Sequence, residues 1–367
     1  MQELYIGIMS GTSLDGIDAV VVDFSHSPPK LIGHFYRKYH DPLRHAILTL
    51  CEPGTDEINR LAEIDIQLGK EYAKTIHSLL NHCQLTPKDI RAIGNHGQTI
   101  RHYPHKQFTL QVGDPNMIAA ETGITTIADF RRADIAQGGQ GAPLVPAFHQ
   151  ALFRHSSINR VIVNIGGIAN ITLLPAETKQ PVIGFDTGPG NLLLNVWIEK
   201  HLHVAFDEEG NWGKTGRIID SLLHHWRNDP FFHLPAPKST GREYFNLAWI
   251  QSHLPSSTPA VDIQATLTEL TAWSIIDAIK HYFSSGEIFI CGGGVHNKFL
   301  LQRLHYHADS LFNIASTSKL GIDPTHIEAF AFAWLARQTL TGKPGNLPTV
   351  TGARRSCILG ALYQTIS

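Results

Sequence analysis

The first turn of the chain places small hydroxyl residues, glycine and aspartate between two apolar runs at residues 4–9 and 17–23. Glycine lets a backbone approach a ligand closely, and Gly11 and Gly16 can also take positive φ. Hydroxyl groups and turn amides can donate to phosphate oxygens, while Asp15 and Asp18 could hold Mg²⁺ directly or through water. The candidate phosphate-binding residues are Ser10, Gly11, Thr12, Ser13, Leu14, Asp15, Gly16 and Asp18. We therefore predict a phosphate-binding β-hairpin, although an ordinary glycine-rich hairpin would share this pattern.

Two further glycine turns extend this pattern. Gly166 and Gly167 join an apolar run at 160–165 to a second at 168–174, which repeats the architecture of the first hairpin. A third group follows the apolar run at 288–291 and opens a predicted helix, so a flat ligand such as adenine could pack on bare backbone. Its members are Gly292, Gly293 and Gly294. The alternative for this group is close packing between a strand and a helix.

Asp186 is the candidate catalytic base. It lies in the glycine-rich and proline-containing segment 184–191, at the end of a short apolar run and ahead of a predicted helix. A helix N-terminus favours a charged carboxylate, which could then accept a proton from a hydroxyl or a water. The alternative role for Asp186 is that of a helix cap.

Polar residues follow two other predicted strands. Amide, imidazole and guanidinium groups suit sugar hydroxyls, amides and carboxylates. The candidate substrate residues are Asn95, His96, Gly97, Gln98, Thr99 and Arg131. Glu328, early in an apolar helix predicted at 325–341, is a second candidate catalytic carboxylate. For any one of these residues, turn formation, salt bridging or a helix-start carboxylate is the alternative.

These elements predict an α/β fold in two halves that each open with a glycine-turn hairpin. We expect lobes at 1–130 with roughly 345–367 and at 131–344, with the ligand cleft between them. The segment 129–146 is the expected crossing and hinge, and 207–242 an insertion containing one helix. The further strands are expected at 31–38, 91–95, 108–112, 124–128, 182–186, 287–291 and 311–316, and the helices at 56–83, 113–122, 188–202, 262–284, 296–310 and 325–341.

Composition excludes several classes of partner. The 367 residues are 43% hydrophobic and carry a formal net charge of −2, and no run of Lys and Arg exceeds two residues. Such a chain lacks the charge pattern that binds nucleic acid or an anionic membrane. No cleavable leader pattern and no 18-residue apolar stretch occur, which favours a cytoplasmic enzyme.

Several of these motifs, in this order, resemble the anhydro-N-acetylmuramic acid kinases. The segments that carry the resemblance are 9–16, 95–99, 129–131, 138–146, 164–170 and 184–191. The resemblance implies a two-lobed actin-like ATPase fold, a duplicated ribonuclease H-like architecture, that uses ATP and Mg²⁺. It implies that the hairpins at 10–16 and 166–167 bracket the ATP phosphates, that the loop at 292–294 receives adenosine, and that the enzyme is a homodimer.

The resemblance also implies a substrate and a mechanism. The small-molecule substrate would be 1,6-anhydro-N-acetylmuramic acid from peptidoglycan turnover, and the product N-acetylmuramic acid 6-phosphate. Asp186 would be the base for a water that attacks C1, Glu328 would orient that water, and Arg131 would pair with the lactyl carboxylate. Two alternatives stay open: another sugar kinase of this fold, tested with N-acetylmuramic acid itself, and a nucleotide-dependent switch or assembly protein, tested by ATP turnover without sugar.

Overall fold

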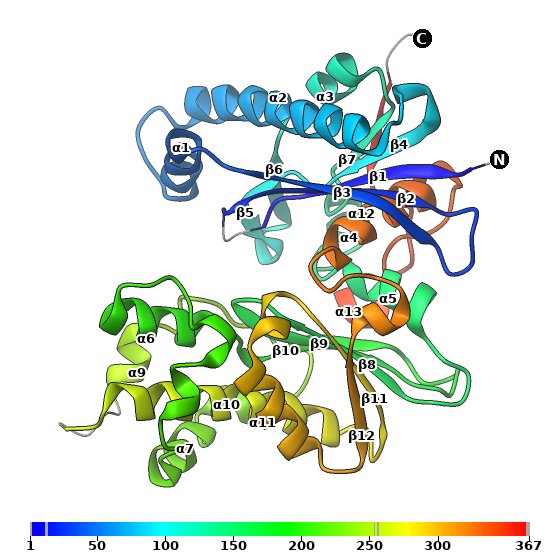
Figure 1. Cartoon of the computed structure of the whole chain (residues 1–367). Coiled ribbons are helices and arrows are strands. Elements are labelled where there is room, and N and C mark those ends of the chain that lie inside the picture. Colours follow the sequence, from blue (N-terminus) through cyan, green and yellow to red (C-terminus); the bar gives the residue numbers. More distant parts are fainter. Residues whose placement is uncertain (1, 12–13, 253, 255–256, 365–367) are drawn as a thin grey trace. The chain divides into compact units, whose positions relative to one another are not determined.

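The chain folds into two compact units. A computed structural model describes residues 2–11, 14–252, 254 and 257–364. Unit 1 comprises Met1–Phe148 and His326–Ser367, and unit 2 is the single stretch His149–Thr325. Figure 1 labels their elements along the chain. Unit 1 is therefore built from two segments that are far apart in sequence.

Unit 1 is organised around a mixed six-stranded sheet. Its strands are β1 (Leu4–Met9), β2 (Gly16–Asp23), β3 (Lys30–Lys38), β4 (Ile90–Asn95), β7 (Thr126–Ala128) and β13 (Ala361–Tyr363), in the order β13-β7-β4-β1-β2-β3. Strand β2 runs antiparallel to β1 and β3, whereas β1, β4 and β7 are parallel. The carboxyl ends of β1 and β4 are therefore neighbours, which brings the turn at 10–15 beside the loop at 96–97.

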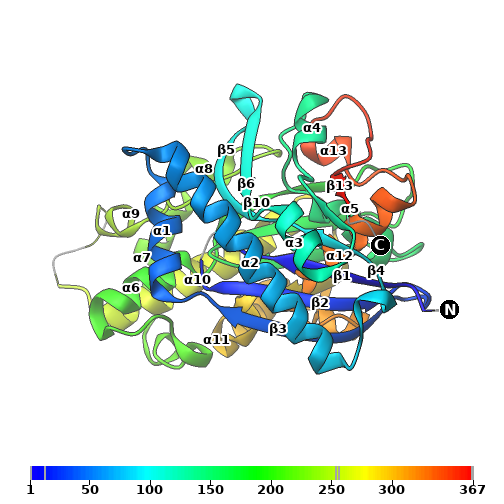
Figure 2. The same cartoon turned by 90° about the horizontal axis from the view of Figure 1, so that it is seen from above.

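Helices cover both faces of this sheet. On one face lie α2 (Glu57–Cys83) and α3 (Pro115–Thr122), and on the other α12 (Ile327–Leu340) packs against β1 and β4. Figure 2 shows α2 running across the strands of unit 1, next to α1 (Asp41–Cys51). Contact with α12 requires bare backbone, because a Cβ at Gly7 would lie 1.8 Å from the Ala329 carbonyl oxygen and one at Gly94 would lie 2.0 Å from that of Phe332.

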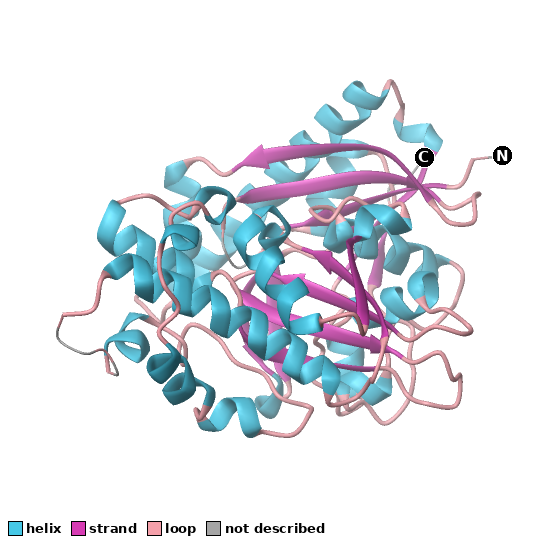
Figure 3. Cartoon of the chain, turned by 60° about the horizontal axis from the view of Figure 1, so that its bottom comes forward, coloured by secondary structure: helices cyan, strands magenta, loops and turns pink. Residues whose placement is uncertain are grey.

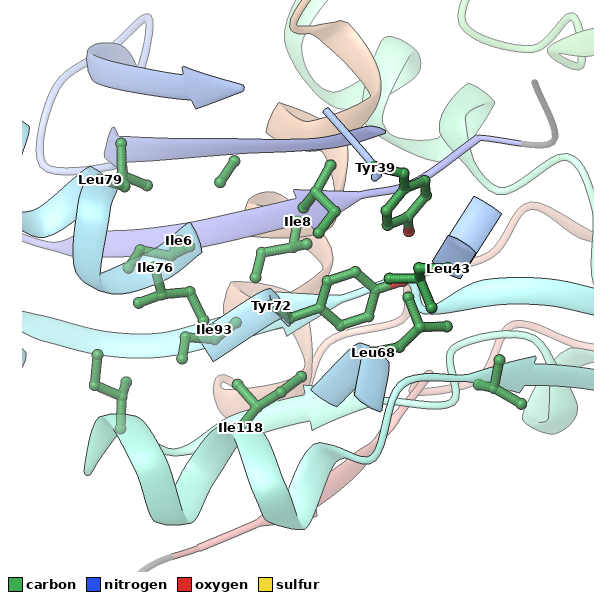
Figure 4. Close-up of a cluster of buried hydrophobic side chains, with 14 of the residues drawn as sticks. Ile6, Ile8, Tyr39, Leu43, Leu68, Tyr72, Ile76, Leu79, Ile93 and Ile118 are labelled. Atoms are coloured by element: carbon green, nitrogen blue, oxygen red, sulfur yellow. The ribbon is translucent and has the colours of Figure 1, made fainter. Parts of the chain in front are cut away.

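The periodicity of α2 explains how it buries its inner face. Ile64, Leu68, Tyr72, Ile76 and Leu79 recur at three- and four-residue intervals and are at most 5% exposed. This spacing forms a continuous apolar stripe on one side of a helix. Figure 4 shows several of these side chains meeting those of the sheet.

A two-stranded hairpin completes unit 1. It consists of β5 (Gln98–Tyr103) and β6 (Phe108–Val112), which pair antiparallel. The sequence predicted only the second of these strands. Unit 1 also contains the short helices α4 (Arg132–Ala136), α5 (Val145–Phe153) and α13 (Pro348–Thr351), and α5 crosses the boundary after Phe148.

Unit 2 repeats the strand order of unit 1. Its strands are β8 (Arg160–Ile165), β9 (Ile168–Leu174), β10 (Ile183–Pro189), β11 (Gly286–Cys291) and β12 (Phe312–Ser316), in the order β10-β9-β8-β11-β12. Read from the other edge, the order β12-β11-β8-β9-β10 corresponds to β7-β4-β1-β2-β3 of unit 1. Strand β9 runs antiparallel to β8 and β10, as β2 does to β1 and β3, whereas β8, β11 and β12 are parallel. Matching order and direction in both units confirm the duplicated α/β, ribonuclease H-like fold that the sequence predicts. Figure 3 shows strands and helices in separate colours.

A helical layer adjoins the sheet of unit 2. Its members are α6 (Leu192–Leu202), α7 (Asp220–Arg227), α8 (Pro230–His233), α9 (Leu247–Gln251), α10 (Ala260–Lys280) and α11 (Lys298–Ala308). The stretch 207–242, expected to be a polar insertion with one helix, contains both α7 and α8. Trp226 and Phe231 from it are buried in a cluster with α10. Apolar residues spaced among Gly, Pro and Asn therefore make this stretch part of the core.

The unit boundaries differ from the expected lobes. Residues 131–148 and 326–344, which the sequence placed in the second lobe, lie in unit 1. The reason for the second shift is the packing of α12 on Gly7 and Gly94. The first shift follows from Asp134, which is fully buried and accepts hydrogen bonds from the C-terminal residues Asn346 (2.6 Å) and Thr351 (2.7 Å).

Candidate active site

The predicted phosphate turn joins β1 to β2 in unit 1. Thr12 and Ser13 lie outside the described residues. Leu14 has a positive φ of 59°, whereas Gly16 does not. Glycine is needed at position 16 because the chain packs closely there: a Cβ would lie 2.4 Å from the Arg37 carbonyl oxygen. Ser10 is 2% exposed, and its hydroxyl faces the interior of the unit. Of the described residues of the turn, Asp15 therefore faces solvent, whereas Ser10 holds the turn to the interior of the unit.

Carboxylates collect beside this turn. Asp15 is exposed, and Asp18, paired with Met9 across the hairpin, is half-buried. Burial and the negative charges of Glu328 and Asp15 raise the pKa of Asp18 to about 6. No group of three or more His, Cys, Asp or Glu among the described residues is arranged as a metal cage. Mg²⁺ in kinases is commonly bound by one or two carboxylates together with water and phosphate, so a pair of aspartates beside the turn fits that donor set.

The loop after β4 is held by its own side chains. Asn95 Oδ1 accepts the N–H of Gly97 at 3.1 Å, and its Nδ2 donates to the Gly113 carbonyl at 3.2 Å. Asn95, His96, Gly97 and Gln98 are all buried, and Thr99 Oγ1 accepts from Gln111 Nε2 at 3.2 Å. The expected substrate residues therefore form an ordered loop, and their buried side chains contact protein.

Arg131 joins this loop. Its Nη2 and Nε donate to His96 Nε2, at 2.7 and 3.2 Å, and its Nη1 donates to the Gly141 carbonyl at 2.7 Å. Burial lowers the pKa of Arg131 to about 10, and the negative charge of Glu328 acts in the opposite direction. Glu328 retains access to solvent; the protein packed around it raises its pKa, while Arg131 lowers it. Arg131 and Glu328 are therefore electrostatic neighbours.

A cavity of about 360 Å³ adjoins the same loop in unit 1. Its size lies within the range of small-molecule pockets. Burial raises the pKa of two of its acids, Asp65 and Asp129. Its polar lining includes Asp65, Asn95, His96, Gln111, Asp129 and Arg132. The cavity thus presents hydrogen-bonding groups beside the loop that the sequence assigns to substrate.

In unit 2, the second glycine turn joins β8 to β9. The carbonyl of Gly166 accepts the N–H of Asn191 at 2.8 Å, and that of Gly167 accepts the N–H of Gly190 at 2.8 Å. No heavy atom lies closer than 3.7 Å to a Cβ built at Gly166, or closer than 3.9 Å to one at Gly167. The described protein around these two residues does not itself require glycine there.

Asp186 lies inside β10, three residues before its end at Pro189, and α6 begins only at Leu192. The expected placement directly ahead of a helix is therefore wrong. Thr240 N–H donates to Asp186 Oδ2 at 3.0 Å, and no other hydrogen bond reaches this carboxylate from the described part of the chain. Burial and the negative charge of Glu243 raise the pKa of Asp186 to about 6, although the hydrogen bond from the Thr240 amide lowers it. Asp186 is thus a half-buried carboxylate whose Oδ2 is held by Thr240, while no described residue donates a hydrogen bond to its Oδ1.

The third glycine group follows β11. A Cβ at Gly292 would lie 2.4 Å from Asn164 Oδ1, and one at Gly294 would lie 2.4 Å from Ile165 Cγ2. Gly292 also has a φ of 79°. Gly293 is exposed, with its nearest neighbour, Asn191 Nδ2, at 4.0 Å. Close packing therefore accounts for the two outer glycines, and the middle one presents open backbone.

Sequence reasoning missed the residues that set the environment of Asp186. They come from the segment 238–243: the Lys238 carbonyl accepts the Asp186 N–H at 3.1 Å, and Thr240 and Glu243 act as described above. The Gly, Pro and Asn content of the wider stretch 207–242 indicates loops, but it does not indicate which residue a loop will contact. Asn191, which donates from Nδ2 to the Ile165 carbonyl at 3.2 Å, was likewise not singled out.

Comparison with known proteins decides which family this site belongs to. A family model described as anhydro-N-acetylmuramic acid kinase matches residues 3–365. The chain belongs to this family. Curated anhydro-N-acetylmuramic acid kinases include that of Pasteurella multocida, 51% identical over 98% of this chain and 96% of that protein. Another, from Saccharophagus degradans, is 50% identical over 98% of each chain.

Solved structures give weaker likenesses to this kinase-family chain. A ROK family glucokinase from Streptomyces griseus in complex with glucose and AMPPNP is 11% identical, with a TM-score of 0.42 over 91% of this chain and 99% of that one. The activator of the 2-hydroxyisocaproyl-CoA dehydratase from Clostridium difficile, with bound ADPNP, is 13% identical, with a TM-score of 0.44 over 92% and 97%. Among the described helices, none has the length and apolarity needed to span a membrane.

Proposed function

We propose that the chain is an ATP-dependent kinase that converts 1,6-anhydro-N-acetylmuramic acid and water to N-acetylmuramic acid 6-phosphate in peptidoglycan recycling. Family membership supports the substrate. The structural observation that carries the chemistry is Asp186, whose carboxylate is held at one oxygen and whose pKa is raised to about 6. Such a group is ionised near neutral pH and still basic enough to take a proton.

The substrate explains why a base must act on water. Its O6 is tied to C1 in an ether and has no proton to lose. Asp186 takes a proton from water, the oxygen of that water bonds to C1, and the C1–O6 bond breaks. The electron pair left on O6 attacks the γ-phosphorus of ATP, and ADP departs. The products are the 6-phosphate with a hydroxyl on C1, ADP and one proton.

Backbone amides at the two glycine turns are the proposed phosphate ligands, one turn in each unit. At Gly166 and Gly167 the space beside Cα is open, which supports close approach of a ligand to the backbone. The exposed backbone of Gly293 is the proposed surface for adenosine.

Asp15 and Asp18 are the proposed carboxylates for Mg²⁺. Burial and the negative charges of Glu328 and Asp15 raise the pKa of Asp18, and a bound cation would offset those charges, which supports this assignment. When bound, the ion would neutralise charge that develops on the transferred phosphoryl group.

The sugar is assigned to Arg131 and to Asn95, His96, Gly97 and Thr99. Gln98 is left out of this assignment, because its side chain is 1% exposed and donates to the Gly11 carbonyl. We retain pairing of Arg131 with the lactyl carboxylate as a proposal, because three N–H groups of its guanidinium are engaged and a guanidinium carries five. Glu328 is the proposed second carboxylate that orients water. Alanine at either position should raise KM or lower kcat, and a change in neither would make the residue structural.

The deciding experiment measures the mass of the product that the enzyme makes from ATP and 1,6-anhydro-N-acetylmuramic acid in ¹⁸O-labelled water. The mass is measured early, before the C1 hydroxyl exchanges its oxygen with the solvent. The proposal expects a 6-phosphate with one ¹⁸O at C1, formed by wild type and lost in Asp186→Asn. Faster phosphorylation of N-acetylmuramic acid than of its anhydro form would replace the substrate assignment. ATP turnover without sugar would favour a nucleotide-dependent switch.

The proposal includes a homodimer and a cytoplasmic location, where ATP is available. Light scattering of the purified protein at micromolar concentration should give twice the mass of one chain. Cell fractionation should recover the kinase activity with the soluble cytoplasmic fraction. The mass of a single chain would contradict the homodimer, and activity in another cell fraction would contradict the cytoplasmic location.

A further inference from the structure

We propose that Gln98 and Tyr72 are positioning residues that link the phosphate turn after β1 to the sugar loop after β4, so that ATP and the amino sugar bind with positive coupling. This inference rests on the proposed function. The sequence placed Gln98 among the sugar ligands and did not single out Tyr72.

Gln98 faces the phosphate turn. Its side chain is 1% exposed, and Nε2 donates to the Gly11 carbonyl at 3.3 Å. Its Oε1 is buried and receives no hydrogen bond from the described residues. A carboxamide enclosed in this way cannot meet a sugar directly in this conformation. It instead holds the backbone of the turn that is proposed to bind the phosphates of ATP.

Tyr72 acts on the same turn through Ser10. Its hydroxyl lies 2.7 Å from Ser10 Oγ, and Ser10 Oγ donates to the Gly97 carbonyl at 3.3 Å. Either hydroxyl can be the donor in the Ser10–Tyr72 hydrogen bond, and in both cases the bond links α2 to the turn. Figure 4 shows Tyr72 rising from α2 into the apolar core near Ile8 and Leu43. The ring is fully buried, so the hydroxyl is held in place by packing.

These hydrogen bonds connect the phosphate turn and the sugar loop, so that a shift of one is expected to move the other. A third link is made by backbone, since His96 N–H donates to the Ile8 carbonyl at 3.1 Å. Within the sugar loop, the Asn95 side chain fixes Gly97. A ligand that favours one position of either loop therefore favours the matching position of the other, and reciprocal coupling of the two affinities follows.

The test is calorimetric titration of the full chain with Mg²⁺ and a non-hydrolysable ATP analogue, with and without saturating 1,6-anhydro-N-acetylmuramic acid. In wild type, we expect the sugar to tighten nucleotide binding about tenfold, within the usual range of such coupling. In Gln98→Met and in Tyr72→Phe, which keeps the buried ring, the factor should fall below about twofold. Sugar affinity measured without nucleotide should stay at the wild-type value in both.

Gln67→Met, on the exposed side of α2, is the matched control and should retain the full coupling. A merely structural role would lower the melting temperature of the variants without changing the coupling factor, and that result would overturn the proposal. Loss of sugar affinity in Gln98→Met without nucleotide would make Gln98 a direct ligand and would also overturn it. Independent binding of both ligands by wild type would refute the coupling alone, whereas failure of wild type to bind the sugar would refute the proposed function as well.

Discussion

The guanidinium of Arg131 donates from Nη2 to Nε2 of His96 at 2.7 Å. A nitrogen that accepts a hydrogen bond carries no proton, so the proton of His96 is on Nδ1 and the ring is neutral. Burial, and then the positive charge of Arg131, lower the pKa of His96 well below its usual value. His96, which the sequence offered as a substrate residue, is therefore held in one tautomer.

His96 should stay neutral from pH 5 to pH 8. Nitrogen NMR of labelled histidine should show protonated Nδ1 and bare Nε2 throughout this range. In Arg131→Ala the pKa of His96 should rise, because the positive charge that lowers it is gone, and kcat/KM for the sugar should fall about tenfold or more. A wild-type His96 that titrates near pH 6.5 would contradict the geometry.

The value of kcat should fall below about pH 6, because the proposed base Asp186 becomes protonated there. Asp186, with its pKa raised to about 6, accepts a proton only while ionised, so kcat should fall tenfold per pH unit on the acidic side. Asp186→Asn should reduce kcat by about 10²-fold or more and remove this acidic limb. The check is the pH profile of initial rates at saturating substrates. A wild-type profile that is flat down to pH 4 would rule out Asp186 as the base.

The same carboxylate should lower stability at neutral pH. Since the folded-state pKa of Asp186 lies above its unfolded value, the folded state binds more protons between about pH 4 and pH 6. Stability due to this group therefore falls as pH rises through that window. Asp186→Asn should be more stable than wild type by about 1 kcal/mol at pH 8 and equal to it below about pH 4. Urea unfolding at the two pH values measures this, and an unchanged difference would show that the pKa of Asp186 is not raised in the folded state.

Glycine at 166 should be functional and not structural. A Cβ at this position would have no heavy atom closer than 3.7 Å, and the φ of Gly166 lies outside the positive range, so Gly166→Ala should unfold at the wild-type temperature. The added methyl group should nevertheless weaken binding of the ATP analogue about tenfold or more, because it occupies the space proposed for phosphate. Gly294→Ala, which would contact Ile165 at 2.4 Å, is the contrasting variant and should lower the melting temperature. Normal nucleotide affinity in Gly166→Ala would remove this turn from the phosphate site.

Asp18→Asn should raise the Mg²⁺ concentration that gives half-maximal activity about tenfold, and chelation should abolish the activity of both proteins. Because the pKa of Asp18 is raised to about 6, protons should compete with Mg²⁺ below that pH in wild type. The variant should lack this competition. The check is the Mg²⁺ concentration for half-maximal activity of wild type and of Asp18→Asn, measured at pH 5.5 and at pH 7.5. Equal concentrations in the two proteins would exclude Asp18 as a ligand.

The hairpins could be predicted because apolar runs bounded by glycine are a local signal. Helix α1 and strands β5 and β13 were not predicted, because short segments with mixed exposure carry little periodicity. The neighbours of Asp186 at 238–243 could not be found either, since a loop about fifty residues away has no pattern that names its target. Similarly, the apolar helix at 327–340 is recognisable as buried, but only the bare backbone of Gly7 and Gly94 shows which sheet receives it.

The packing of α12 on Gly7 and Gly94 also has a consequence for biosynthesis. Unit 2 is one uninterrupted stretch, whereas the sheet of unit 1 lacks its α12 cover until 327–340 has been made. Because a ribosome releases the chain from its N-terminus, unit 2 can complete its core first. The phosphate turn and sugar loop would then gain their full support only near the end of translation, and a truncated nascent chain would have no finished kinase site with which to consume ATP.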